Sequence, residues 1–181
     1  MDHERESLEQ TLAPLGNMPV VIRAAAVGDA PVLAALGRRV FAETYGAQLP
    51  GPVLQAHLET ALSPEVFAAK IAEGKAHYLL AEAGGVAAGF VKLEGADGAV
   101  EIAKFYVDKG FHGTGLAGGL MGAGLEWARA KGFGTVWLLV WEENPRAVRF
   151  YRKYGFEVVG RQEVWVGPVA FQDHRMQRGL A

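Results

Sequence analysis

The sequence predicts a mixed α/β fold of the α+β type: a twisted, mostly antiparallel sheet with one central parallel pair of strands, flanked by helices. Three β-prone runs are joined by short glycine turns, and apolar residues at helical spacing lie on either side of them. One helix stands between two strands, which requires those strands to be parallel with a right-handed crossover. The chain has 181 residues, of which 50% are hydrophobic, enough for one substantial core.

The order of elements follows from these patterns. The expected elements are a strand over 20–23, a helix from Asp29 to Gly46, helices over 53–62 and 64–73, strands over 77–83, 86–94 and 99–107, a helix over 115–131, a strand over 135–141, a helix over 144–154, and a closing hairpin over 156–166 and 171–177. Asp29, Ser63 and Asn144 are N-cap residue types that precede a proline by one or two positions. We expect a flexible extension over 1–18 and a single domain over 19–181.

Composition excludes several classes of function. The net charge is -2 and the pI is about 6.2, so no positive field is available for nucleic acid or an acidic membrane surface. The charged start of the chain has no signal-peptide core, and no apolar run reaches the roughly 20 residues of a membrane span. We therefore expect a cytoplasmic protein.

Covalent and metal chemistry are also unexpected. Cysteine is absent, the only serines are Ser7 and Ser63, and the five histidines lack metal-ligand spacing. A transferase of this composition would pass its group directly from donor to acceptor, with both held in one site.

Glycine is concentrated in one segment. Nine of the 24 glycines lie between Gly110 and Gly134. The stretch from Gly113 to Gly118 matches the dinucleotide pattern G-x-G-x-x-G, with Glu142 as a ribose-binding acid, but residues 108–112 separate it from the strand, where that motif needs a tight turn. A glycine loop before a helix still offers free backbone N–H groups, which suits a pyrophosphate. We expect this role for Gly113 and Gly115, and helix packing for Gly118, Gly119, Gly122 and Gly124.

Two motifs carry a family resemblance. Residues 112–117, HGTGLA, resemble the acyl-CoA pyrophosphate loop Q/R-x-x-G-x-G/A of the GCN5-related N-acetyltransferases, with His112 in place of the usual Gln or Arg. Residues 144–156, NPRAVRFYRKYGF, resemble the second signature of that family, N-x-x-A-x-x-F-Y-x-x-x-G-F. The resemblance implies acetyl-CoA as donor, with no metal, bound where the parallel strands splay apart.

The resemblance also assigns the donor site. The residues that it implies for acetyl-CoA are Phe105, Tyr106, Val107, His112, Gly113, Thr114, Gly115, Leu116, Ala117, Asn144 and Tyr151. The backbone N–H of Val107 would help to stabilise an oxyanion on the thioester. Asn144 has a sufficient structural role as an N-cap, which is compatible with a contact to CoA.

Tyr151 and Glu101 are the expected catalytic residues. The resemblance makes Tyr151 the general acid for the CoA thiolate, and a phenol with a pKa of about 10 stays protonated at neutral pH. Glu101 is expected to be the base, facing the side opposite Ile102, Lys104 and Tyr106 on strict strand alternation. The alternatives are an aromatic packing residue at position 151, a solvated or lysine-paired glutamate at position 101, and water chains in place of a single base.

The acceptor is expected to be a primary amine of a small, polyamine-like molecule. The residues expected to contact it are Phe41, Glu43, Thr44 and Tyr45, whose run resembles the helix end of small-amine acetyltransferases. Two other functions stay open, acetylation of a protein lysine or N-terminus and a non-catalytic regulatory module that binds acyl-CoA. A homodimer is also considered.

Overall fold

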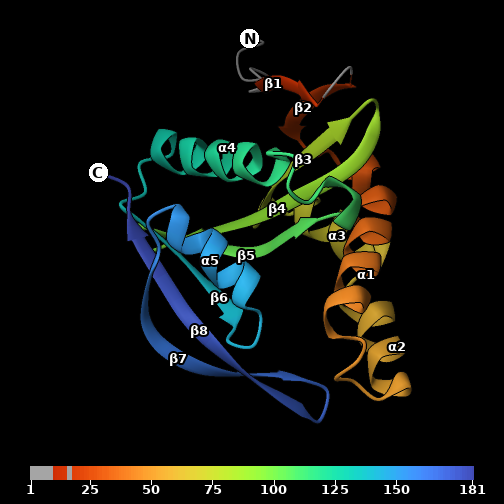
Figure 1. Ribbon diagram of the computed structural model, residues 1–181. Helices are drawn as coiled ribbons and strands as arrows, with labels where there is room; N and C mark the ends of the chain where they lie inside the picture. The colour runs from red at the N-terminus through yellow and green to blue at the C-terminus, as the bar shows by residue number, and fades with distance from the viewer. Residues whose placement is uncertain (1–9, 16–17) are drawn as a thin grey trace.

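The fold is built on one eight-stranded sheet, which the computed structural model describes for residues 10–15 and 18–181 (Figure 1). The strands are β1 (Gln10–Leu15), β2 (Met18–Ala24), β3 (His77–Ala83), β4 (Val86–Ala96), β5 (Ala99–Val107), β6 (Thr135–Trp141), β7 (Glu157–Val166) and β8 (Val169–Gly179). Their order across the sheet is β1-β2-β3-β4-β5-β6-β8-β7. Only β5 and β6 pair in parallel, which confirms the predicted class.

Helices cover both faces of this sheet and bury two apolar clusters. They are α1 (Ala30–Tyr45), α2 (Gly51–Thr60), α3 (Pro64–Ala72), α4 (Leu116–Ala130) and α5 (Pro145–Lys153), with short 3-10 turns η1 (Val27–Asp29) and η2 (Lys109–Phe111). One cluster lies between the sheet and α4 and α5, and the other between the sheet and α1 and α3. Figure 1 shows α4 and α5 over one face, while α1, α2 and α3 gather on the other side.

The N-terminal segment contains a strand that the sequence did not predict. β1 pairs antiparallel with β2 and adds an outer strand to the sheet, although it falls within the extension expected over 1–18. Residues 1–9 and 16–17 of that extension lie outside the described part of the chain. The division between the extension and a domain over 19–181 stays a prediction.

Two of the three predicted helix caps are confirmed. Ser63 Oγ accepts from the Val66 N–H at 3.3 Å, and Asn144 Oδ1 accepts from the Ala147 N–H at 3.3 Å. Asp29 does not cap α1 with its side chain. Its own backbone is helical, so its carboxylate instead accepts from the Ala26 N–H at 2.8 Å and pairs with Arg23, which holds the turn before the helix.

A β-bulge in β5 makes Glu101 face the side of the sheet opposite to the predicted one. The register between β4 and β5 skips Ala103, which has no partner on β4. The extra residue shifts the alternation, so Glu101 faces the same side as Lys104 and Tyr106, the side of α1. The prediction that it faces the opposite side from them was therefore wrong.

No helix in the described residues is long and apolar enough to span a membrane.

Candidate active site

The site is a gap in the middle of the sheet. β5 and β6 are paired only from Ala99 opposite Thr135 to Ile102 opposite Leu138. Beyond that point β5 stays with β4, and β6 stays with β8 as far as Trp141. The two parallel strands therefore separate toward their carboxyl ends, as the sequence predicted.

The end of β5 turns backbone groups into this gap. The Asp108 N–H donates to the Ala88 carbonyl at 2.9 Å, which makes Val107 a non-hydrogen-bonded position opposite Gly89. The N–H and carbonyl of Val107 consequently point away from β4, toward the gap. His112 Nε2 lies 3.0 Å from the Val107 carbonyl oxygen, while the N–H is left with no partner in the described chain.

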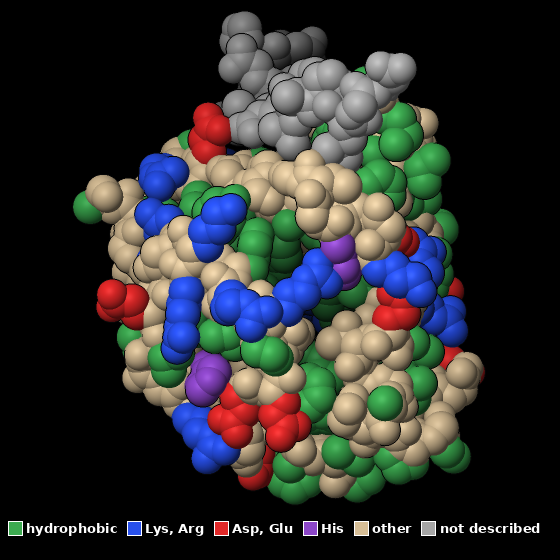
Figure 2. Space-filling view, in the orientation of Figure 1, with side chains coloured by type: hydrophobic (Ala, Val, Ile, Leu, Met, Phe, Trp, Pro, Cys, Tyr) green, Lys and Arg blue, Asp and Glu red, His purple; other side chains and the backbone are tan. Residues whose placement is uncertain are grey.

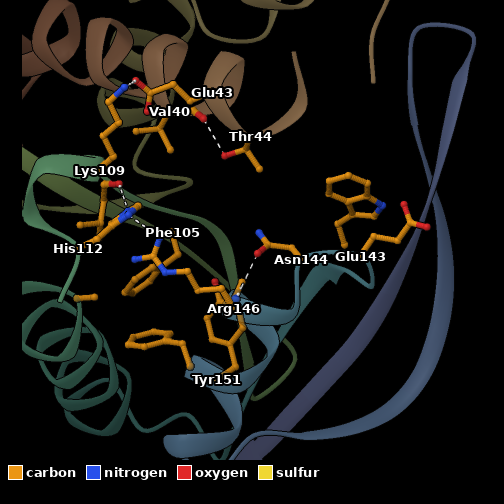
Figure 3. A pocket seen from close by; sticks show the side chains of 15 residues that line it. Val40, Glu43, Thr44, Phe105, Lys109, His112, Glu143, Asn144, Arg146 and Tyr151 are labelled. Atoms are coloured by element: carbon orange, nitrogen blue, oxygen red, sulfur yellow. Dashed lines mark hydrogen bonds and ion pairs between the residues drawn. The ribbon is translucent and has the colours of Figure 1, made fainter. Parts of the chain in front are cut away.

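A cavity of about 560 Å³ occupies the gap and the space beside it (Figure 3). Its lining residues are Val40, Glu43, Thr44, Phe105, Val107, Lys109, His112, Ala117, Trp141, Glu143, Asn144, Arg146, Ala147, Phe150 and Tyr151. They come from α1, the end of β5, the loop before α4, the end of β6, and α5. Figure 2 shows a hollow with hydrophobic side chains inside it and Lys, Arg and His side chains around its rim.

The cavity brings together about half of the predicted site. The predicted residues that line it are Glu43, Thr44, Phe105, Val107, His112, Ala117, Asn144 and Tyr151, while Phe41, Tyr45, Glu101, Tyr106, Gly113, Thr114, Gly115 and Leu116 do not. The lining residues that the sequence did not single out are Val40, Lys109, Trp141, Glu143, Arg146, Ala147 and Phe150. Helical spacing would have found those on α5, because Ala147 and Phe150 share a face with Asn144 and Tyr151.

The loop before α4 forms an anion cradle. Gly113 and Gly115 have φ angles of 77° and 87°, and a Cβ at either position would meet nothing within 4 Å. The N–H groups of Gly113, Gly115, Ala117 and Gly118 donate to no group in the described chain. Free donors at the positive end of a 15-residue helix suit a phosphate oxygen.

The glycines expected to serve packing behave differently from one another. A Cβ on Gly118 would clash with the Tyr154 hydroxyl, and one on Gly124 would touch Leu93 at 3.9 Å. A Cβ on Gly122 would meet nothing within 4 Å, so packing does not require glycine there.

His112 ties the loop to the rest of the site. Its Nδ1 lies 2.5 Å from an Arg146 guanidinium nitrogen, and a guanidinium can only donate. Nδ1 is therefore the acceptor, and Nε2–H donates to the Val107 carbonyl. The residue that departs from the family motif thus links β5, the glycine loop and α5, and it holds a cationic side chain at the cavity wall (Figure 3).

Tyr151 is both packed and available as a donor. Its ring lies among Phe105, Phe150 and Phe156, with centroid distances of 6.1, 5.5 and 5.9 Å. The residue is 8% exposed and its hydroxyl has no hydrogen bond in the described chain, yet it borders the cavity. Burial raises the pKa of this phenol well above its usual value, so it stays protonated.

Glu101 lies away from the cavity. It sits opposite Trp137 in the paired part of β5 and β6, before the gap opens. Burial, helped by the charge of Glu94, raises the pKa of its carboxyl. On the same face burial lowers the pKa of Lys104 to about 8.

Asp173 is a buried carboxylate that the sequence did not point to. It lies on β8 directly opposite Trp141, is 8% exposed, and makes no hydrogen bond or ion pair with any described residue. Burial and the charge of Glu142 raise the pKa of this carboxyl to about 6, against a smaller opposing effect of His174. The sequence alone does not show that an aspartate within a strand will be buried without a hydrogen-bond or ion-pair partner.

Asp173→Asn is expected to stabilise the folded protein at pH 7.5. The carboxyl pKa rises from 3.8 to about 6 on folding, so its contribution to stability is complete below pH 3.8 and is lost as the pH rises through 6. The loss amounts to about 1–3 kcal/mol, which a neutral amide avoids. Urea unfolding at pH 7.5 and pH 4 measures it. A stability gain of equal size at both pH values would contradict the buried, ionised carboxylate.

A parallel strand pair that separates beside a glycine loop at a helix start is a geometry that suits an acyl-CoA molecule, with room for its thioester in the gap and free N–H groups for its pyrophosphate. The Acetyltransferase (GNAT) family model matches residues 41–156. A protein of Mycobacterium tuberculosis named as an uncharacterized N-acetyltransferase is 34% identical over 153 residues, covering 84% of this chain and 98% of its own. The chain belongs to the GNAT family and is an N-acetyltransferase that uses acetyl-CoA as donor.

Solved structures share the fold. The PaiA N-acetyltransferase of Thermoplasma acidophilum, in complex with coenzyme A, aligns with a TM-score of 0.76 and 20% identity over 88% of this chain and 98% of its own. An N-acetyltransferase of Staphylococcus aureus aligns with a TM-score of 0.72 and 18% identity over 90% and 99% of the two chains. At these identities the likeness extends to the fold alone.

Proposed function

We propose that the protein transfers the acetyl group of acetyl-CoA directly to a primary amine of a small, positively charged molecule. The observation that carries this proposal is the convergence of two unpartnered donors, the Val107 N–H and the Tyr151 hydroxyl, on one cavity between the separated strands. One donor suits the thioester oxygen and the other the thioester sulfur.

The donor molecule is assigned to the glycine loop and the wall of α5. The free N–H groups from Gly113 to Gly118 suit the pyrophosphate, and the space at Gly113 and Gly115 is open for it. Arg146, which contacts His112 of that loop, adds positive charge at the cavity wall. Thr114 and Leu116 are assigned to the same loop, and the pantetheine arm then follows β5 past Phe105 and Tyr106 to the gap.

The chemistry needs two proton movements. The amine loses a proton and its nitrogen attacks the thioester carbonyl carbon, forming the C–N bond while the Val107 N–H donates to the oxygen. The C–S bond then breaks, and Tyr151 gives its proton to the departing thiolate. The tyrosinate recovers a proton, through water, from the nitrogen that has become the amide.

In this proposal Glu101 acts as the base without contacting the amine. Glu101 faces the α1 side of the sheet but lines no part of the cavity, so it takes the amine proton only through intervening water. A proton relay of this kind is compatible with direct transfer, because the base need not touch the nitrogen.

The acceptor is assigned to the α1 end of the cavity. Glu43 lines it and pairs with Lys109 at 3.4 Å across the opening (Figure 3). Phe41 stacks on His57 and Tyr45 packs against Trp141, at 4.3 and 5.6 Å between ring centroids. Aromatic rings beside carboxylates favour a cationic acceptor.

A thiol-release assay over a panel of primary amines tests the function. We expect CoA release that depends on a small amine, with the acetylated amine identified by mass spectrometry. Acetylation of peptide lysines or N-termini but of no small amine would favour a protein acceptor. Tight CoA binding with no acetylation of any amine would favour a regulatory module.

Arg146→Ala is expected to raise the KM for acetyl-CoA about tenfold with little change in kcat. The reason is that the hydrogen bond proposed between this charged side chain and acetyl-CoA contributes roughly 1.5 kcal/mol or more. The change removes positive charge from the cavity wall and frees His112 from one partner. Arg149→Ala is the matched control, because it removes the same charge from the same helix outside the cavity lining. Equal KM values for both variants would remove Arg146 from the donor site.

A further inference from the structure

The carboxylate of Asp173 has no cationic partner in an ion pair within the described chain. The residue is only 8% exposed, yet no hydrogen bond or ion pair within the described chain involves its carboxylate. No buried side-chain oxygen in the described residues is sealed away without a partner, so this carboxylate still reaches open space. A buried carboxylate without a partner is costly, and binding sites are where that cost is retained.

The surroundings of Asp173 are aromatic. Trp141 lies directly across the strand pair, and Tyr45 and Phe171 pack with it at centroid distances of 5.6 and 5.5 Å. These rings and the carboxylate lie on the α1 side of the sheet. Trp141 also lines the cavity, so the carboxylate stands one strand beyond the cavity wall.

Three cations of the neighbouring elements have other partners, and His174 acts on Asp173 only through its charge, with no hydrogen bond or ion pair between them in the described chain. Arg161 pairs with Glu142 at 2.6 Å, Lys109 pairs with Glu43, and Arg175 lies 3.9 Å over the ring of Trp137. Asp173 and the aromatic face of Trp141 are therefore left to attract a cation from outside the protein.

We propose that Asp173 is a specificity-determining residue that binds a second, non-reacting ammonium group of the acceptor. This inference rests on the proposed function and narrows it to diamines and longer polyamines. The reacting amine lies in the gap, the carbon chain crosses the face of Trp141, and the distal ammonium reaches Asp173. Neighbouring strands are about 4.8 Å apart, a distance that a chain of four carbons spans.

Two acceptors of equal length provide the test. 1,4-Diaminobutane and 4-aminobutan-1-ol differ only in the distal group, an ammonium against a hydroxyl. At pH 8, where alkylamines are protonated, we expect the wild-type protein to show at least a tenfold higher kcat/KM for the diamine. In Asp173→Asn this preference should disappear through loss of activity on the diamine alone, with the KM for acetyl-CoA unchanged.

Glu163→Gln provides the matched control, because it makes the same carboxyl-to-amide change on the same hairpin, where Glu163 is exposed and accepts from Gln172 at 3.1 Å. Its preference for the diamine should equal that of the wild type. Equal kcat/KM values for the two acceptors in the wild type, or a preference that survives in Asp173→Asn, would overturn the inference.

A binding measurement distinguishes a failure of this inference from a failure of the proposed function. If neither amine is acetylated, the proposed function fails, and titration of 1,4-diaminobutane into the CoA-loaded protein still measures the site. Binding to the wild type that is lost in Asp173→Asn would support the inference. No binding to the wild type would overturn it.

Discussion

Tyr151→Phe is expected to lower kcat by roughly 10- to 10⁴-fold with little change in the KM for acetyl-CoA. The substitution keeps the ring, which packs among Phe105, Phe150 and Phe156, and removes only the hydroxyl. That hydroxyl has no hydrogen bond in the described chain, so its loss leaves no structural partner unsatisfied. Kinetics with circular dichroism and thermal unfolding of the same samples measure the effect.

Tyr154→Phe is the control for this variant. Tyr154 lies three residues along the chain, at the end of α5, and its ring packs against Phe150 at 5.0 Å between centroids. Its hydroxyl lies against the backbone of Gly118, and the residue does not line the cavity. We expect kcat within a factor of about two of the wild type, as for a residue outside the reacting groups. Equal kinetic losses in the two variants would defeat the assignment of Tyr151 as acid.

The architecture follows closely from the sequence because its signals are local. Gly84-Gly85 and the turn from Gly95 to Gly98 give the two hairpins of the β3–β4–β5 meander, and the helix between β5 and β6 makes those strands parallel. Eight of the eleven residues predicted for the donor site lie in two short motifs, and the other three lie at the end of β5, so their places follow from the elements that carry them.

The features that the sequence did not predict depend on how strands distant in the chain pair with one another. Nothing local marks Ala103 as the extra residue of a bulge, and the bulge alone decides which face Glu101 takes. Asp173 is buried where β8 meets Trp141 of β6 and lies near Tyr45 of α1, both of which are far from it in sequence. Strand β1 was missed because its six residues include Pro14, a residue type that argues against a strand.

The proposed acetyl-CoA side and the proposed acceptor side of the cavity are built from different kinds of groups. The proposed donor side relies on backbone N–H groups of one loop and one strand end, and a glycine loop before a helix provides such donors locally. Side chains from α1, β6 and β8 form the proposed acceptor side, and these meet only when the sheet is assembled. Substrate choice therefore depends on residues that no single motif contains.

Gly115→Glu is expected to abolish measurable CoA binding while the protein remains folded. A Cβ at Gly115 would meet nothing within 4 Å, so a new side chain enters open space beside the free N–H groups of the loop. A carboxylate there occupies the pyrophosphate position and repels its charge, whereas the backbone strain costs only about 1–2 kcal/mol. Calorimetric titration with CoA and circular dichroism together decide the outcome.

Gly98→Glu is the matched control for Gly115→Glu. Gly98 has a φ of 78° and equally open space around its Cβ position, but it lies in the turn between β4 and β5, at the opposite end of β5 from the gap. The two variants therefore carry the same strain and the same added charge. We expect Gly98→Glu to bind CoA like the wild type and Gly115→Ala, which adds strain without charge, to bind it less than tenfold more weakly. Unchanged CoA affinity in a folded Gly115→Glu protein would remove the loop from the donor site, because a phosphate cannot share the cradle with a carboxylate.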